Sequence, residues 1–525
     1  MRSSSIVRIT AVAASVFLGS HLARAAVLTW DNGGGDQLWT TVTNWNPDGT
    51  PSGNDVVFAN TGTAAAGVVT NDTDGNWTIN TLNFLNTGSS GGAQTTRIAS
   101  SQTLTISGTG ATAFSIGPTG SGVSNATPTY VVFNGGGALA VTGGTAATFA
   151  VATGSASTNM VNSLNMSALG SFTANIGSFM VANNARQAAT VLLSSVTNSI
   201  TTTTFTVGSN SNSSGSNYGC FIGLGAANTL FANTINIGSI KSSGTMTFQG
   251  SVTNGAVTIR DYAGTGAATL VLGAQTASSG ATSNGVLDFT AGRVDALFST
   301  VTLGQGSPST GTGGGLGAIT LGPGIITSGT VYAGTAGATT SAASTAVGTV
   351  NLLANSGTFA ATSMVLGRQA NAQPANGSGV VNQAGGVATI GTLTFANYTA
   401  AGTGLVSGTY NLSDGTLRAA TIQAGANSAT TGTSSRTFNW SGGTIQNFDS
   451  STNLTIAGSN SFTLLLAGTS TKAFSVDTGR TITTTAVIGS TGTAGFSKDG
   501  PGTLVLASGG NWFSGTTTIN AGVLN

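Results

Sequence analysis

The stretch "GTYNLSDGTLRAATIQAG", from Gly408 to Gly425, decides the fold of this 525-residue chain. Apolar and polar residues alternate on both sides of a short polar segment, which is the pattern of β-strands with one buried face. Within that segment, Asp414-Gly415 is a strong local signal for a tight turn. The stretch therefore predicts strands joined by a turn, and its features return along much of the chain.

Two marks in the sequence share one period. An apolar-x-apolar-Gly motif ends, at intervals of 29 to 35 residues, at Gly208, Gly238, Gly273, Gly304, Gly334, Gly367 and Gly425, with Ala396 in the same slot. A second glycine mark recurs every 28 or 29 residues, at Gly357, Gly386, Gly415 and Gly443. Two marks with one period indicate a repeat of about 30 residues rather than a composition bias.

A repeat of this length, with several short strands and no helix, predicts an all-β parallel β-helix, or β-solenoid, of ~30-residue coils. Strands of successive coils pair in parallel, so the strand spacing of about 4.8 Å becomes the rise per coil. The ~500 mature residues then give on the order of 16 coils and a rod of roughly 75 Å. Gly367 and Gly425 should lie on one edge, two coils apart, and the insertions after Gly304 and Gly367 should be loops on one side.

The composition supports strands and limits the partners. Charged residues make up 5% of the chain, against about 25% in an ordinary domain. Glycine accounts for 80 residues and glutamate does not occur. Few strong helix formers remain, whereas Thr, Val and Ile favour a pleated surface. No basic patch for nucleic acid or for a membrane surface is visible.

The first residues predict a secretory signal peptide at 1–25. Arg2 and Arg8 precede the short apolar core "ITAVAASVFLG", and "ARA" at 23–25 fits a cleavage site. Cleavage would remove the single histidine, His21, and leave 11 basic and 13 acidic residues, a net charge of −2. No apolar run is long enough to span a membrane. The expected localisation is secreted or at the cell surface.

The start of the mature chain is rich in tryptophan and aspartate. Trp30, Trp39 and Trp45 lie within sixteen residues, Trp77 follows, and Asp31, Asp36, Asp48 and Asp55 lie among them. A solenoid needs a cap over the apolar cross-section of its end, and aromatic rings cover area well. Residues 26–145 are therefore predicted to hold an N-terminal cap and the first coils, followed by solenoid repeats at 146–494. A surface on which sugars stack is the alternative for these tryptophans.

Candidate chemical groups are sparse. Arginine and aspartate lie close in sequence in three places, where a polysaccharide-cleaving β-helix would need them: Arg260 with Asp261, Arg293 with Asp295, and Asp477 with Arg480. Solvated surface pairs are the preferred interpretation of all three.

Two further features, a possible calcium loop and a single cysteine, also have a structural interpretation. Asp72, Asp74 and Asn76 alternate as calcium ligands can, but Trp77 stands where an EF-hand loop requires glycine, so a turn is preferred. Cys220, the single cysteine, is expected to be a small buried side chain. The sequence thus predicts no catalytic, cofactor-binding or metal-binding residue and no cofactor.

The last predicted segment is 495–525, and its stretch "FSKDGPGTLVLASGGNWFSGTTTINAGVLN", which begins at Phe496, resembles the autotransporter-associated β-strand repeat of large bacterial surface proteins. The positions that match its pattern are Phe496, Lys498, Gly500, Gly502, Thr503, Leu504, Leu506, Asn511, Phe513, Gly515, Thr517, Ile519, Gly522 and Leu524. The resemblance implies a right-handed β-helical, passenger-like rod with no known catalysis. An autotransporter would continue past Asn525 into an outer-membrane barrel, so a truncated chain or another holding component is expected.

These features together predict an exported, non-enzymatic β-solenoid that acts as a structural, adhesive or display rod at the bacterial cell surface. Glycans or other surface components are the expected partners, without nucleic acid and without a membrane-spanning segment, and the oligomeric state is open. A β-helical polysaccharide-active enzyme and a carbohydrate-binding module that uses the N-terminal tryptophans are the alternatives.

Overall fold

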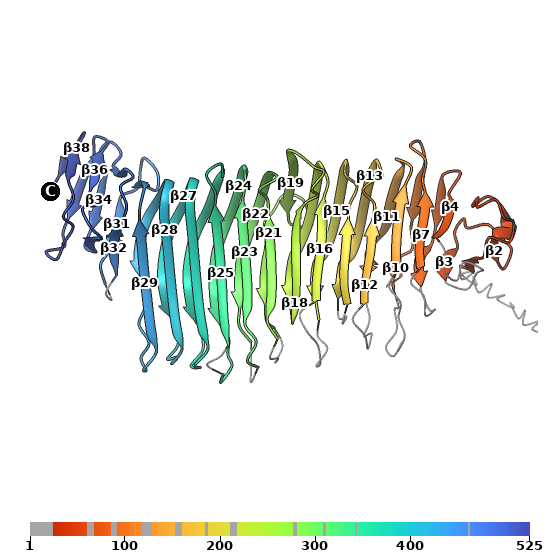
Figure 1. The fold of residues 1–525 in the computed structure, drawn as a ribbon, viewed down its shortest axis with the longest axis horizontal. Coiled ribbons are helices and arrows are strands. Elements are labelled where there is room, and N and C mark those ends of the chain that lie inside the picture. The colour runs from red at the N-terminus through yellow and green to blue at the C-terminus, as the bar shows by residue number, and fades with distance from the viewer. Residues whose placement is uncertain are drawn as a thin grey trace, which may run out of the picture.

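A computed structural model describes residues 25–59, 68–85, 92–110, 112–117, 129–152, 160–183, 187–210, 218–276, 281–307, 311–341, 344–459 and 462–525. The chain is all β, and its strands form a parallel β-solenoid of about 14 coils of ~30 residues. Figure 1 shows the coils side by side along one axis, with β3 and β4 near one end and β36 and β38 at the other. The signal peptide predicted at 1–25 lies outside the described residues, except for Ala25.

Each full coil has three faces, and every face is a parallel ladder. The first face contains β4 (Val68–Asp72), β7 (Gly92–Arg97), β10 (Thr129–Asn134), β12 (Met160–Asn165), β14 (Gln187–Leu192), β16 (Tyr218–Leu224), β18 (Ser242–Phe248), β21 (Ser283–Asp288), β23 (Gly315–Leu321), β25 (Thr345–Leu352), β29 (Thr433–Trp440), β32 (Thr463–Leu466) and β35 (Val487–Ser490). The second face contains β5 (Trp77–Ile79), β8 (Thr103–Ile106), β19 (Gly255–Arg260), β30 (Gly443–Asn447), β33 (Lys472–Ser475), β36 (Phe496–Asp499) and β38 (Thr517–Ile519). The third face contains β1 (Val27–Trp30), β3 (Asp55–Ala59), β6 (Thr81–Leu85), β9 (Phe114–Ile116), β20 (Ala268–Ala274), β31 (Leu454–Ala457), β34 (Thr481–Thr484), β37 (Thr503–Leu506) and β39 (Val523–Leu524).

The longer strands turn corners without a break in pairing. Those that run from the second face onto the third are β11 (Ala138–Val151), β13 (Ser171–Asn183), β15 (Thr197–Ser209), β17 (Ala227–Ser239), β22 (Gly292–Gln305), β24 (Gly324–Ala336) and β26 (Thr358–Gln369). β27 (Asn376–Tyr398) and β28 (Leu405–Ala424) cover all three faces. The stretch that predicts the fold is thus one strand, because its Asp-Gly turn lies at a corner of the coil.

The register confirms the predicted stacking. Leu366 pairs with Phe395, and Phe395 pairs with Ala424, so Gly367, Ala396 and Gly425 follow one another along a single corner. The coils number about 14 rather than the 16 expected. One reason is that some coils are longer than 30 residues: Ile237 pairs with Leu272, a step of 35.

The core is one continuous apolar column inside the rod. Inward positions carry Leu, Val, Ile, Ala and Phe, and most of these side chains are fully buried. Phenylalanine rings stack from coil to coil, with ring centroids 4.3 Å apart for Phe114 and Phe149, 4.7 Å for Phe149 and Phe179, and 5.0 Å for Phe179 and Phe205. Equivalent side chains in neighbouring coils therefore complete each other's packing.

The corner between the third and first faces is closed by backbone rather than by side chains. Residues with positive φ follow one another there from coil to coil, at Gly117, Ala152, Ala182, Gly208, Gly238, Gly273, Gly304, Gly334, Gly367 and Ala396. A second column of glycines, on the first face, packs against it: Gly244, Gly285, Gly317, Gly348, Gly379 and Gly408. A Cβ at Gly379 would crowd the amide nitrogen of Gly367. Glycine is needed because two backbones touch.

Polar loops extend beyond this glycine corner. The insertions after Gly304 and Gly367 both connect the third face to the first face of the next coil, so they lie on one side as predicted, and Figure 1 shows this row of loops along the lower edge. Within the second of these loops, Gln369 Nε2 donates to the backbone oxygens of Asn371 (2.7 Å) and Gln373 (2.9 Å). Ala396, Tyr398 and Val406 form a small apolar cluster separate from the main core.

Tryptophan rings cover the N-terminal end of the core. Trp30, Trp39 and Trp45 are buried, and Trp45 stands edge-on to both other rings at 5.0 and 5.3 Å between centroids. The short turn η1 (Val42–Asn44) and the strand β2 (Trp45–Asn46), antiparallel to β1, place these rings. This is the predicted cap.

Candidate binding surfaces

One ion pair joins Arg260 and Asp295, which lie in two neighbouring coils. Arg260 Nη2 lies 2.9 Å from both carboxylate oxygens of Asp295, and Nη1 donates to the Asp295 backbone oxygen at 2.9 Å. In the sequence, by contrast, Arg260 is next to Asp261, and Asp295 lies two residues after Arg293. Asp261 instead accepts hydrogen bonds from the amides of Thr265 and Gly266 at its own turn. The contacts between Arg260 and Asp295 therefore link two neighbouring coils.

The third candidate group is also separated. Asp477 Oδ1 accepts a hydrogen bond from Gln446 Nε2 (3.0 Å), while Arg480 Nη1 donates to the backbone oxygen of Ser451 (2.9 Å). No salt bridge joins Asp477 to Arg480 in the part of the chain that the structure describes. Across the same residues, no group of three or more His, Cys, Asp or Glu side chains could hold a metal ion.

The aspartates near the cap bond to their own surroundings. Asp72 forms an ion pair with Arg97 (2.6 Å), Asp74 accepts from the Thr40 hydroxyl, and Asn76 Oδ1 accepts from the Thr103 amide (2.7 Å). The three side chains of the possible calcium loop therefore each bond to a different partner. The Thr41 hydroxyl first, and then the Leu38 amide and the Asn44 side chain, lower the pKa of Asp36 by hydrogen bonding to its carboxylate.

The N-terminal tryptophans do not form the sugar-stacking surface that was considered for them. Trp39 Nε1 donates to Asn71 Oδ1 (2.8 Å) and Trp45 Nε1 to the Trp39 backbone oxygen (3.1 Å), both within the buried cap. Trp77 is half-buried and packs against Trp39 at 6.2 Å. These rings therefore pack into the cap instead of forming an exposed surface.

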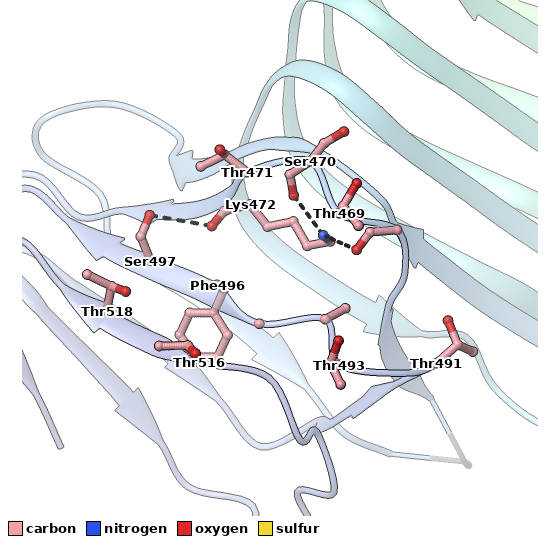
Figure 2. Close-up of a pocket in the computed structure, with 13 residues that line it drawn as sticks. Thr469, Ser470, Thr471, Lys472, Thr491, Thr493, Phe496, Ser497, Thr516 and Thr518 are labelled. Atoms are coloured by element: carbon pink, nitrogen blue, oxygen red, sulfur yellow. Dashed lines mark hydrogen bonds between the residues drawn. The ribbon is translucent and has the colours of Figure 1, made fainter.

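A polar cavity of about 480 Å³ lies at the corner between the first and second faces near the C-terminal end (Figure 2). Thr469, Thr491 and Thr493 line it with Phe496, and its cation is Lys472. Lys472 Nζ donates to the backbone oxygens of Ser470 (2.8 Å) and Gly468 (3.3 Å), as the dashed lines in Figure 2 mark. Burial lowers the pKa of Lys472. The lining offers hydroxyl groups and no carboxylate, so it suits a polar ligand better than acid–base chemistry.

Further hollows follow the same corner toward the middle of the rod. One of about 690 Å³ is lined by residues 250–256 and 290–293 with Pro323, and one of about 190 Å³ by residues 321–323 and 353–356 with Thr290. Arg293 is exposed at the larger hollow. Neither hollow contains a carboxylate in its lining.

Cys220 is buried, as expected from its apolar neighbours. It pairs with Gly244 at the head of the first-face glycine column, where only a small side chain fits. Burial raises the pKa of its thiol to about 12. A thiol held so strongly in its neutral form is unsuited to nucleophilic chemistry.

Two outward polar columns were missed by the sequence reasoning. On the third face, hydroxyl side chains occupy one position in successive coils, at Thr148, Ser178, Thr204, Thr234, Thr269, Thr300, Thr330, Ser363, Thr392, Thr421, Thr455 and Thr483. On the first face, an asparagine ladder runs through Asn351, Asn382, Asn411 and Asn439. The signal was present, since each asparagine directly follows an apolar or aromatic residue, at intervals of 28 to 31.

The last coil carries an exposed aromatic ring. Trp512 is 55% exposed and lies over Gly489, where a Cβ would overlap the indole. Below it, Lys498 is buried, and its Nζ donates to the backbone oxygens of Asp499 (2.9 Å), Gly500 (2.7 Å) and Ala521 (3.0 Å). The lysine and glycines of the motif therefore fasten one corner to the next coil.

Comparison with known proteins gives one match. Residues 496–525 match the passenger-associated-transport-repeat family, which confirms the resemblance of this segment to autotransporter passengers. No curated protein and no solved structure gives a significant match to the chain. No helix long and apolar enough to cross a membrane occurs among the residues whose placement is described.

Proposed function

Because residues 496–525 match a passenger-associated-transport repeat, we propose that the protein is an exported, non-enzymatic rod that displays its loops at the bacterial cell surface. The repeat belongs to passenger regions by its name, and the β-solenoid fits such a region. The adhesive or structural role is our proposal.

The observation that carries this function is the pairing of coil with coil along the rod, with local register shifts between β11 and β13, β20 and β22, and β27 and β28. Parallel ladders continue on all three faces, and each coil pairs with the coil before it and the coil after it. Stability in such a stack is nearly a sum of coil and nearest-neighbour contributions. The remaining coils should therefore stay folded when a single coil is removed, as expected of a spacer.

The distribution of charge supports a passive role. Asp295 and Arg260 clamp two coils, and Asp477 and Arg480 bond to separate partners. A general acid and base need a common substrate within hydrogen-bond reach. The candidates that the sequence offered for a polysaccharide-active enzyme do not converge in this way.

Deletion of one coil tests the spacer function. Thr358 pairs with Val387, so removal of residues 358–386 joins Gly357 to Val387 and keeps every later register. We expect a folded rod shortened by about 4.8 Å, still exported and still cleaved by protease added outside the cell. The matched control removes only β26, residues 358–369, which leaves an incomplete coil and should cause misfolding.

Two results would contradict the proposal. One is loss of export or folding on the in-register deletion, since a spacer tolerates it. The other is release of reducing or unsaturated sugars when the purified full chain is incubated with polysaccharides, which would show an enzyme.

A further inference from the structure

The asparagine ladder on the first face presents an ordered row of amides. Asn382 Nδ2 donates to Asn351 Oδ1 (2.9 Å), Asn411 to Asn382 (2.8 Å), and Asn439 to Asn411 (2.8 Å). Asn351 Nδ2 continues the row to Thr320 Oγ1 (3.3 Å). These side chains point outward from strands whose alternate residues fill the core, so the row lies on the surface.

Each amide retains capacity for a ligand. A side-chain amide has two N–H donors and an oxygen with two lone pairs. Within the ladder, Asn382 and Asn411 each use one donor and one lone pair. One N–H and one lone pair per coil are left to face outward, and their geometry is fixed before any ligand arrives. Such preorganisation lowers the entropic cost of binding.

The interval between the amides selects the class of ligand. Equivalent groups recur at the coil rise of about 4.8 Å. An extended peptide rises about 3.3 Å per residue, and its side chains alternate between faces. Nucleic acid repeats at about 3.4 Å per base and needs cations for its phosphates. A linear polysaccharide of equatorially linked pyranoses repeats, sugar by sugar, close to the coil interval.

The side chains beside the ladder are neutral. The adjacent outward column holds Thr349, Val380, Thr409 and Thr437. Arg436, on the same strand as Asn439, turns its guanidinium to backbone oxygens of the loop corner rather than to this surface. Acidic polysaccharides would find no cation along the row, so a neutral one fits best.

An aromatic platform lies farther along the same column. Asn439 pairs with Leu465, Leu465 pairs with Gly489, and the ring of Trp512 rests on Gly489. The backbone amide of Trp512 donates to the Ile488 oxygen (3.0 Å), which holds the Trp512 backbone against the neighbouring coil. Glycine allows the indole to lie against the sheet, and the ring's exposed surface is apolar enough to stack on a sugar.

From this alignment we infer that the first face binds a neutral linear polysaccharide, laid along the rod axis from the asparagine ladder to Trp512. The inference rests on the proposed display function, because it names the partner that such a rod would hold. It also places carbohydrate recognition at the opposite end of the rod from the N-terminal tryptophans.

Binding of the purified full chain to insoluble cellulose and chitin tests this inference, with polygalacturonate and heparin as acidic comparators. We expect retention on a neutral polymer, and about tenfold weaker retention for Trp512→Ala, the loss of one stacking contact. Asn411→Thr should weaken retention as well, and it keeps the fold because Thr320 already occupies this column. Tyr332→Ala and Asn236→Ala, on the third face, are the matched controls and should bind normally.

Fluorescence gives a second measurement. The other tryptophans are buried or half-buried, so a shift in emission on adding soluble neutral oligosaccharides should come from Trp512 and vanish in Trp512→Phe. Equal retention by wild type and both first-face variants, retention on acidic polymers alone, or no retention would overturn the inference. If the coil-deleted rod is still exported and folded in that case, the display function stands without it.

Discussion

Gly367 and Gly425 occupy equivalent positions two coils apart, yet different groups surround them. Gly367 has φ +73° and lies against the carbonyl oxygen of Ser407, whereas the oxygen of Gly425 accepts a hydrogen bond from Arg436 Nη2 (3.1 Å). Arg436 pairs with Gly408 and therefore follows the last glycine of the first-face column. The first-face column of glycines therefore ends at Gly408, and the guanidinium of Arg436, in the next coil, bonds to the backbone oxygens of the corner.

Replacing Gly367 by alanine should destabilise the rod by at least about 2 kcal/mol, since the left-handed conformation and the overlap with Ser407 both oppose a Cβ. Urea unfolding followed by circular dichroism measures the change. Gly479→Ala is the control, because φ is +68° there and no atom lies near the added Cβ. It should cost only about 1 kcal/mol. Equal costs would mean that the close backbone packing is unimportant.

Replacing Arg436 by methionine should destabilise the coils around it by about 2–3 kcal/mol, the range for hydrogen bonds to a charged group. The backbone oxygens of Phe395, Ala396 and Gly425 would each lose a charged donor, although the Gly425 amide would still donate to the Phe395 oxygen. Arg436→Lys should rescue only part, because an ammonium lacks the planar fork. Hydrogen exchange at residues 395–440 measures the effect. Arg480→Met, which removes one bond to Ser451, should change little.

The thiol of Cys220 should resist modification in the folded protein. Its pKa is raised to about 12 by burial, whereas an unfolded thiol titrates near 8.5. The unfolded state therefore loses its proton first, so this contribution to stability is complete below about pH 8.5 and falls as the pH rises toward 12. Reaction with a disulfide reagent at about pH 8 should be slow in buffer and fast in urea. Cys220→Ala should flatten the alkaline decline, and fast labelling of the folded chain would contradict the assignment.

Replacing Lys498 by methionine should loosen the last coil. Its ammonium donates to Ala521 across the coil boundary as well as to Asp499 and Gly500. Limited proteolysis with mass spectrometry should show earlier cleavage between residues 507 and 525. Lys472→Met is the control, because that ammonium bonds within its own loop, to Gly468 and Ser470. Early cleavage in both variants would show a general loss of stability instead.

The period of the fold could be predicted because glycine marks a corner that other residues avoid. The sequence does not reveal that Ala152, Ala182 and Ala396 adopt positive φ at the same corner. Alanine carries no such preference, and the coils above and below impose the conformation. The second glycine column was missed because its neighbours vary from coil to coil.

Side-chain partners were harder to predict than the repeat. Arg293 and Asp295 lie on one strand, two residues apart, where outward side chains are separated by roughly 7 Å. Arg260 reaches Asp295 from the neighbouring coil, diagonally, because Asp295 pairs with Thr258 and the long arginine side chain spans the remaining two residues. In a solenoid, the distance between two side chains depends on coil register as well as on sequence separation, so charges that are close in sequence need not form a pair.

The asparagine ladder has a direction. Asn382, Asn411 and Asn439 each donate to the asparagine of the preceding coil, and Asn351 donates to Thr320, so the dipoles add along the rod instead of cancelling. A polysaccharide has a reducing and a non-reducing end, and a polar row would distinguish them. Rods that share such a row would all align on a polymer with the same end forward.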